Sequence, residues 1–228
     1  MTQNIFVAGA TGRTGRIIIH KLIQKGYQPH ALVRDLDSAR QLLGDNPIYH
    51  QGDVRDFDTL IQAIKGADAV ISAVGANTPV GKNCPKNVDY QGVINLIRAA
   101  LESNVPRFIL ISSIAVTHPE HPLNCFGKVL DWKRKAEQVL QETTLDYAII
   151  RPGGLINIAG GQRELIFGQG DQLMGTISRE SVAEVCLRVL NLPAPLQITF
   201  ELIENDQQEQ TDWERLFGAL IPDPLSPD

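Results

Sequence analysis

Cysteines, aromatic residues and long apolar runs are all scarce in this sequence. Three cysteines stand at the distant positions 84, 125 and 186, and this odd number excludes a disulfide scaffold and indicates a reducing, cytoplasmic environment. No stretch approaches the ~20 consecutive apolar residues of a membrane span, and the first residues lack a signal-peptide pattern. Basic blocks are missing too, and with a net charge of −5 the chain is not expected to bind nucleic acid or an anionic membrane surface.

Clusters of metal-ligand residues are also missing. His118 and His121 are spaced like a pair of ligands, but they lie in a proline-containing loop with no third ligand nearby. We therefore expect no metal site.

The sequence does contain a regular alternation of short β-type runs and helical patterns. Its 228 residues, 43% of them apolar, fit one large α/β domain over residues 1–228. The central strands are apolar on both faces, which is typical of a mostly parallel sheet covered by helices, so we expect a doubly wound fold. The expected strands are residues 3–8, 29–34, 47–50, 68–74, 107–112, 145–151 and 196–204, and the expected helices are residues 12–25, 37–43, 56–65, 87–103, 125–142, 179–191 and 211–220.

Local patterns set some of the boundaries. Ser178 precedes a helix in a capping position, and Thr211 with Glu214 has the spacing of a capping box. A glycine-rich stretch, about residues 153–176, is predicted to be one long irregular loop above the carboxyl edge of the sheet, where a substrate would bind. The proline-rich tail from about residue 222 is expected to fray.

The strongest motif is the glycine-rich turn near the start of the chain. An apolar run that ends at Ala8 is followed by glycines at positions 9, 12 and 15 and by an amphipathic helix. This arrangement is typical of a site for the pyrophosphate of a dinucleotide, in which the first glycine permits the turn, the second lets the backbone approach the phosphates and the third lets the helix pack on the strand. An ordinary tight turn is the alternative. The residues assigned to the cofactor here are Gly9, Thr11, Gly12, Arg13, Thr14 and Gly15.

The residue after the second strand indicates which nucleotide is bound. A carboxylate at this point would bind the ribose 2′-hydroxyl of NAD, whereas a cation such as Arg34 accommodates the 2′-phosphate of NADP. Asp35 follows directly, so a shift of one residue would favour NAD, and Arg34 as a solvated loop residue is a further alternative. Arg13 and Arg40 can add positive charge. We expect NADPH to be preferred over NADH.

The ends of the next two strands offer further cofactor contacts. Asp53 can accept a hydrogen bond from the adenine amino group, and Val54 can cover the ring. The small side chains of Ala73, Val74 and Gly75 let the following strand end pass beneath the cofactor.

Together these motifs resemble a known family. The segments VAGATGRTG, LVRD, GDV, AVISAVG, NVDYQGVINLI, ILISSIAV, WKRKAEQVL and IIRPGGL follow the order of the short-chain dehydrogenase/reductase superfamily over about residues 3–190. More narrowly, the chain resembles the atypical, NmrA-like branch, which includes flavin (biliverdin) reductase-type proteins. The resemblance implies an NAD(P)-binding Rossmann fold with two candidate catalytic residues, Ser113 and the ribose-binding Lys133, and with Ser112 beside the first. It also implies that the nicotinamide lies near Ser113, beside Pro152, Gly153, Gly154 and Leu155.

The tyrosine of the superfamily's Ser–Tyr–Lys set is missing. Val129 stands one helical turn before Lys133, and no other register places a tyrosine there. An activated phenol gives a proton to the alkoxide that forms from an isolated carbonyl, so its absence removes a contribution of roughly 10²–10⁴-fold. The chain is therefore expected to be a poor ketone reductase, and an epimerase or extended-type carbonyl reductase is disfavoured.

Two functions remain open. One is NADPH-dependent reduction of a conjugated acceptor, such as a flavin, quinone or tetrapyrrole, which needs no enzyme phenol. The other is a non-catalytic, NADP(H)-sensing regulatory protein of the NmrA type. We favour the reductase, with a conjugated or aromatic small-molecule substrate, and expect a monomer rather than a dimer. Trp132 and Phe126 offer flat surface to an aromatic ring, with packing inside the protein as the alternative.

Overall fold

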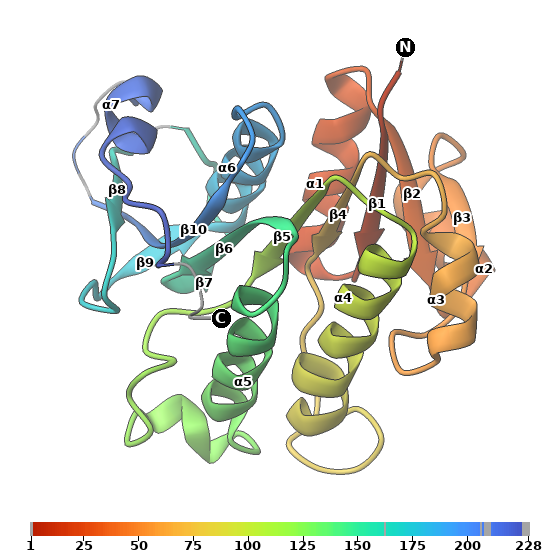
Figure 1. Ribbon diagram of the computed structural model, residues 1–228, viewed down its shortest axis with the longest axis horizontal. Coiled ribbons are helices and arrows are strands. Elements are labelled where there is room, and N and C mark those ends of the chain that lie inside the picture. Colours follow the sequence, from red (N-terminus) through yellow and green to blue (C-terminus); the bar gives the residue numbers. More distant parts are fainter. Residues whose placement is uncertain (1, 162, 206, 208–210, 225–228) are drawn as a thin grey trace.

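All seven expected strands are present in the computed structural model, which describes residues 2–161, 163–205, 207 and 211–224 (Figure 1). They are β1 (Asn4–Ala8), β2 (Gln28–Val33), β3 (Ile48–Gln51), β4 (Ala69–Ser72), β5 (Arg107–Ile111), β6 (Asp146–Pro152) and β10 (Gln197–Glu204). These strands pair in parallel in the order β3-β2-β1-β4-β5-β6-β10. The mostly parallel, doubly wound α/β sheet predicted from the sequence is thus confirmed.

Helices cover both faces of this sheet. On one face lie α1 (Arg13–Gln24), α2 (Leu36–Leu43) and α6 (Arg179–Leu190), and on the other lie α3 (Phe57–Ala63), α4 (Val93–Glu102) and α5 (Val129–Gln141). The short α7 (Trp213–Gly218) packs against the first face. No helix in the described ranges is long and apolar enough to cross a membrane.

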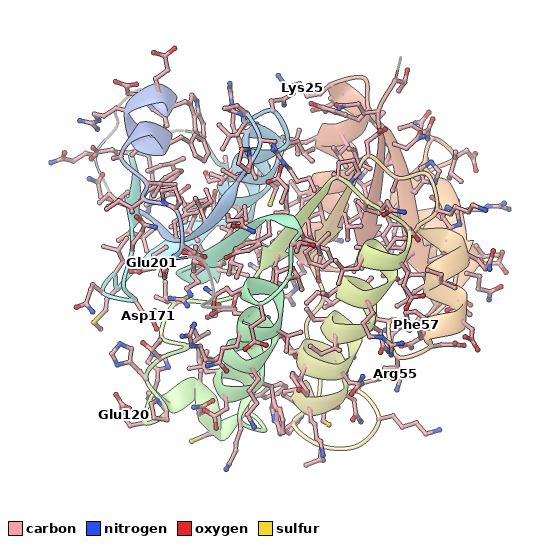
Figure 2. The ribbon with its side chains drawn as sticks, in the orientation of Figure 1. Lys25, Arg55, Phe57, Glu120, Asp171 and Glu201 are labelled. Atoms are coloured by element: carbon pink, nitrogen blue, oxygen red, sulfur yellow. The ribbon has the colours of Figure 1, made fainter. Side chains whose placement is uncertain are left out.

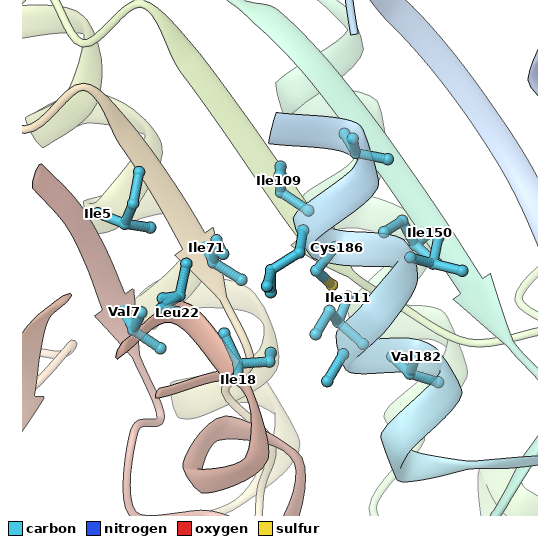
Figure 3. Close-up of a cluster of buried hydrophobic side chains, with 14 of the residues drawn as sticks. Ile5, Val7, Ile18, Leu22, Ile71, Ile109, Ile111, Ile150, Val182 and Cys186 are labelled. Carbon is cyan, nitrogen blue, oxygen red and sulfur yellow. The ribbon is translucent and has the colours of Figure 1, made fainter. Parts of the chain in front are cut away.

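The two faces explain the continuous apolar runs in the sequence. Successive residues of β1 alternate between the faces, so Ile5 and Val7 enter one core cluster while Phe6 and Ala8 enter the other. Figure 3 shows the first cluster, in which Ile18 and Leu22 of α1 and Val182 of α6 pack against the strands. Truncating one of these buried side chains to alanine would cost about 2–5 kcal/mol of unfolding free energy.

Two predicted helices begin differently from the sequence pattern. The helix expected over residues 87–103 starts with a π-helical turn, η1 (Lys86–Gly92), before α4. The helix expected from residue 125 starts only at Val129, after the 3₁₀ turn η2 (Pro122–Cys125). The backbone at Gly127 and Lys128, each with a φ of 58°, is left-handed and interrupts the helix there, and Asn124 Oδ1 accepts the N–H of Leu130 at 2.9 Å in the first turn of α5.

The glycine-rich stretch is not one irregular loop, which corrects the expectation for residues 153–176. It contains β7 (Gly154–Ile156) and β8 (Leu165–Gly168) and leads into β9 (Thr176–Ser178). Strands β8 and β9 pair antiparallel with β10, and β7 pairs in parallel with β9. The stretch is therefore an extension of the sheet beyond β10.

The remaining local predictions have mixed outcomes. Ser178 caps α6 as expected, since its Oγ accepts the N–H of Ser181. The capping box at Thr211 is wrong by one position, because Asp212 caps α7 by accepting the N–H of Arg215. The tail expected to fray from residue 222 is held at Asp223, which accepts hydrogen bonds from the hydroxyls of Tyr147 and Thr199, and residues 225–228 lie outside the described residues.

A pair of histidines lies on β2 and β3. His30 Nδ1 is 2.9 Å from His50 Nε2, and the two rings stack with centroids 5.2 Å apart. Burial lowers the pKa of both imidazoles below the ordinary value of 6.5, and the neighbouring His50 lowers that of His30 further. The folded protein therefore resists protonation of this pair.

This pair predicts a pH-dependent stability. As the pH falls below about 6.5, the unfolded chain takes up protons that the folded pair resists, so the free energy of unfolding should decrease. Replacing His50 with Gln should flatten this decrease between pH about 7.5 and 5.5 in denaturant titrations. Equal slopes for the wild type and His50→Gln would contradict the assignment.

Candidate functional site

The glycine-rich turn brings the ends of β1 and β4 against the start of α1. Gly9 has a φ of 79°, and a Cβ at this position would lie 2.5 Å from the carbonyl oxygen of Ala73. A Cβ on Gly15 would collide with the carbonyl oxygen of Gly9. Glycine is thus required at both positions to form the turn.

The first turn of α1 is open to an anion. Gly12 precedes the helix and has no side chain to cap it, and the first turn contains no acidic residue. The N–H groups at a helix start lack partners within the helix and carry partial positive charge. These features of the turn fit the pyrophosphate of a dinucleotide.

A cleft of about 1070 Å³ lies at the carboxyl ends of β4, β5 and β6. Residues that are far apart in the sequence meet in its walls, as the order of motifs along the sheet indicated. The predicted site residues that line it are Thr14, Ala73, Val74, Gly75, Ser112, Ser113, Lys133, Pro152, Gly153, Gly154 and Leu155. The predicted residues outside this lining are Gly9, Thr11, Gly12, Arg13, Gly15, Arg34, Asp53 and Val54.

The residues expected at the adenine end lie beside β2 and β3. Arg34 is exposed directly after β2. The carboxylate of Asp53 is held by two hydrogen bonds from Arg55, at 2.8 and 2.6 Å. These bonds, with the charges of Arg55 and Arg34, lower the pKa of Asp53. Asp53 therefore has fewer free acceptor positions for an adenine amino group than the sequence indicates, and Val54 is buried against Gly92.

Lys133 reaches the cleft with a partner that the sequence analysis missed. Its Nζ lies 2.9 Å from Oδ1 of Asp89, whose side chain is fully buried. The other carboxylate oxygen of Asp89 accepts the N–H of Ala76, in the segment after β4. Asp89 thus fixes the ammonium group of Lys133 at the cleft wall. The only sequence signal for Asp89 was its place in the NVDYQG segment, which carried the family resemblance.

Two further residues of the cleft lie on α5 and at the end of β5. Val129 lines the cleft together with Lys133, so the position of the missing tyrosine does face the site. Ser112 is buried in the cleft wall, and its Oγ has no hydrogen-bond partner among the described residues. Such an unpaired polar atom at a cleft fits a site that receives a polar ligand.

Apolar side chains line part of the cleft. Phe126 lines it, as one of the two predicted uses of that residue requires, beside the exposed Leu123, Leu155 and Met174. Trp132 is absent from the lining and instead packs on Tyr90, with ring centroids 5.6 Å apart, beneath the ammonium of Lys135.

Two buried carboxylates hold the backbone of this part of the cleft wall through hydrogen bonds. The carboxylate of Glu201 on β10 accepts hydrogen bonds from the backbone N–H groups of residues 171, 172 and 173. The carboxylate of Asp171 accepts hydrogen bonds from the N–H of Ala115 at 2.6 Å and from the N–H and the Oγ1 hydroxyl of Thr117, both at 2.7 Å. Figure 2 shows Asp171 and Glu201 on the side of the molecule opposite Arg55. The glycine-rich stretch is therefore tied to the segment that follows β5.

Asp171 has a lowered pKa despite its burial. Burial alone would raise the pKa, but the hydrogen bonds from Thr117 and Ala115 and the charge of Arg151 outweigh it. Arg151 is itself buried and donates two hydrogen bonds to Glu137 of α5, at 3.0 and 2.7 Å. A buried ion pair thus joins β6 to α5.

Comparison with known proteins agrees with this geometry. The family model described as NAD(P)H-binding matches residues 9–193, and the chain belongs to this family. An uncharacterized chloroplast protein of Arabidopsis thaliana is 38% identical over 82% of this chain, which spans 65% of that relative's length. Sanguinarine reductase of Eschscholzia californica is 32% identical, with 95% of each chain covered. The solved structure of ChuY, an anaerobillin reductase from Escherichia coli O157:H7, has 26% identity and a TM-score of 0.77 over 91% of this chain and 100% of ChuY. The resemblance to atypical, NmrA-like short-chain dehydrogenase/reductases is thus confirmed.

The hydrogen bonds that the Asp171 carboxylate accepts predict a loss of stability in Asp171→Asn. The amide cannot replace both acceptor oxygens, so the free energy of unfolding at neutral pH should fall by roughly 1–3 kcal/mol, and residues 153–176 should be cleaved faster in limited proteolysis. Because the pKa of Asp171 is lowered, its stabilisation is lost as the pH falls below the ordinary value of 3.8, and the two proteins should converge there. The exposed Asp45→Asn is the matched control, and equal proteolysis of all three proteins would contradict this role of the Asp171 carboxylate.

Proposed function

We propose that this protein is an NADPH-dependent reductase of a conjugated small-molecule acceptor. The observation that carries the proposal is the cleft itself, which continues from the open start of α1 into an apolar end where Val129 takes the place of the phenol. A nucleotide held at α1 would direct its other end toward that apolar region. The names of two relatives, sanguinarine reductase and anaerobillin reductase, describe reductases and support the same function.

The residues of the cleft have separate roles in this proposal. The first turn of α1 would hold the pyrophosphate, and Lys133, fixed by Asp89, would hold the ribose hydroxyls. Bound NADPH supplies a hydride to an acceptor placed beside Ser113. The protein contributes mainly orientation and exclusion of water.

The missing phenol restricts the acceptor. An isolated carbonyl that receives a hydride becomes a strongly basic alkoxide, whereas a quinone, flavin or open tetrapyrrole spreads the charge over a conjugated system. Val129 cannot donate a proton to either. The stretch 153–176, which includes β7 and β8, would form the outer wall of the substrate site.

The direct test is NADPH oxidation in the presence of single acceptors, namely FMN, a quinone, biliverdin and a simple ketone. We expect turnover of at least one conjugated acceptor and a rate with the ketone that is lower by roughly 10²-fold or more. Equal or faster reduction of the ketone would contradict the proposal. Tight NADPH binding with no turnover of any acceptor would favour the NADP(H)-sensing alternative.

Arg34 should set the nucleotide preference. Charge reversal in Arg34→Glu is expected to weaken NADPH binding by about 10-fold or more while changing NADH binding little, because only NADPH carries the 2′-phosphate. Calorimetric titration with each nucleotide measures the two effects. Lys25→Glu, at the end of α1 remote from the cleft (Figure 2), is a control with the same charge change. Equal weakening of both nucleotides by Arg34→Glu would show that the 2′-phosphate lies elsewhere.

A further inference from the structure

His118 lies in the cleft wall with both ring nitrogens beside acceptors. Its Nε2 is 3.1 Å from the backbone carbonyl oxygen of Asp171, and its Nδ1 is 3.4 Å from a carboxylate oxygen of Glu120. A carbonyl oxygen and a carboxylate can only accept hydrogen bonds, so each ring nitrogen must carry a hydrogen to satisfy them. The two contacts therefore favour the doubly protonated imidazolium.

The surroundings of His118 favour its charged form. The hydrogen bond to the carbonyl of Asp171 raises the pKa of His118 above 6.5, and the charges of Asp171 and Glu120 add to this effect against a smaller opposing effect of burial. The carboxylate of Asp171 is occupied by Ala115 and Thr117, so it contributes through its charge and its backbone carbonyl. The side chain of His118 is 46% exposed, which leaves it in exchange with solvent.

His121 differs from His118 although both line the cleft. Its Nδ1 accepts the backbone N–H of Leu123 at 3.2 Å and caps η2. A nitrogen that accepts a hydrogen bond carries no hydrogen in that contact, so Nδ1 of His121 is not a donor there. The two histidines that were spaced like metal ligands thus differ: His118 lies beside hydrogen-bond acceptors, whereas His121 itself accepts a hydrogen bond.

We propose that His118, and not the position of the missing phenol, supplies the proton that a conjugated acceptor needs. This inference rests on the proposed reductase function. NADPH transfers a hydride to the acceptor, whose oxygen or nitrogen becomes negatively charged. A ring N–H bond of His118 then breaks, the electron pair stays on the ring nitrogen, and the proton forms a new O–H or N–H bond on the acceptor. Water returns a proton to the neutral imidazole at its exposed side, where Glu120 is 75% exposed.

The proposal separates two kinds of acceptor. A neutral quinone needs a hydride and a proton to become a hydroquinone. A cationic N-methylacridinium needs only a hydride, because its product is already neutral. Loss of the proton donor should therefore slow the first reaction and spare the second.

The experiment measures kcat for menadione and for N-methylacridinium with NADPH in the wild type, His118→Gln and His20→Gln. His20 is exposed on α1 outside the cleft lining, which makes His20→Gln a matched control. We expect His118→Gln to lose roughly 10²-fold or more with menadione and less than about twofold with N-methylacridinium. Retained acridinium turnover also shows that the variant is folded and binds NADPH.

A pH profile gives a second readout. In the wild type, the menadione rate should fall as the pH rises through the pKa of His118, whereas the acridinium rate should stay flat. Glu120→Gln removes one charge that favours the imidazolium, so it should shift the menadione profile to lower pH while keeping the ring in place.

Two outcomes overturn the inference while the proposed function stands. In one, His118→Gln reduces menadione as fast as the wild type. In the other, both acceptors slow equally, which would make His118 a structural element of the cleft wall. A wild type that reduces neither of these two acceptors, nor FMN nor biliverdin, would overturn both the inference and the proposed function.

Discussion

The close approach of Gly9 to the carbonyl of Ala73 is the constraint on which the site depends. With no room for a Cβ at Gly9 or Gly15, the chain turns tightly from β1 into α1, and the end of β4 lies against that turn. The uncapped start of α1 and the small residues after β4 thereby meet at the same edge of the sheet. A larger side chain at Gly9 would separate these elements, so a local steric limit determines where a nucleotide can bind.

A second set of interactions builds the other half of the cleft. Buried Glu201 on β10 accepts hydrogen bonds from the backbone at residues 171–173. Asp171 accepts a hydrogen bond from Ala115, in the segment after β5, and so links that segment to β10. Burying carboxylates is costly unless their oxygens are hydrogen-bonded, and here backbone and hydroxyl groups meet that requirement. These hydrogen bonds also place the backbone carbonyl of Asp171 beside His118. The residue that links the two walls of the cleft is therefore also the residue that favours the charged form of His118.

The sequence predicted the strands and the glycine-rich turn well because those features are local. Apolar runs covered on both faces and glycines at fixed spacing depend on neighbouring residues, and Ser112, Ser113 and Lys133 followed from motif order. Asp89, Asp171 and Glu201 could not be found in this way, because each acts on residues that are distant in the chain. Strands β7 and β8 were missed because their apolar runs are only two or three residues long and stand among glycines, and they form through pairing with β9 and β10. Asp212 replaced Thr211 as a helix cap because neighbouring polar residues can satisfy the same N–H groups.

We infer that the cleft holds NADP(H) with its pyrophosphate at the start of α1 and its nicotinamide at the apolar end. A crystal structure of the complex with NADP⁺ tests this most directly. We expect pyrophosphate oxygens hydrogen-bonded to N–H groups of the first turn of α1, Lys133 on the ribose, and the nicotinamide between Ser113 and Gly153. A nucleotide bound on another face of the sheet, or one whose nicotinamide points away from Ser113, would contradict it.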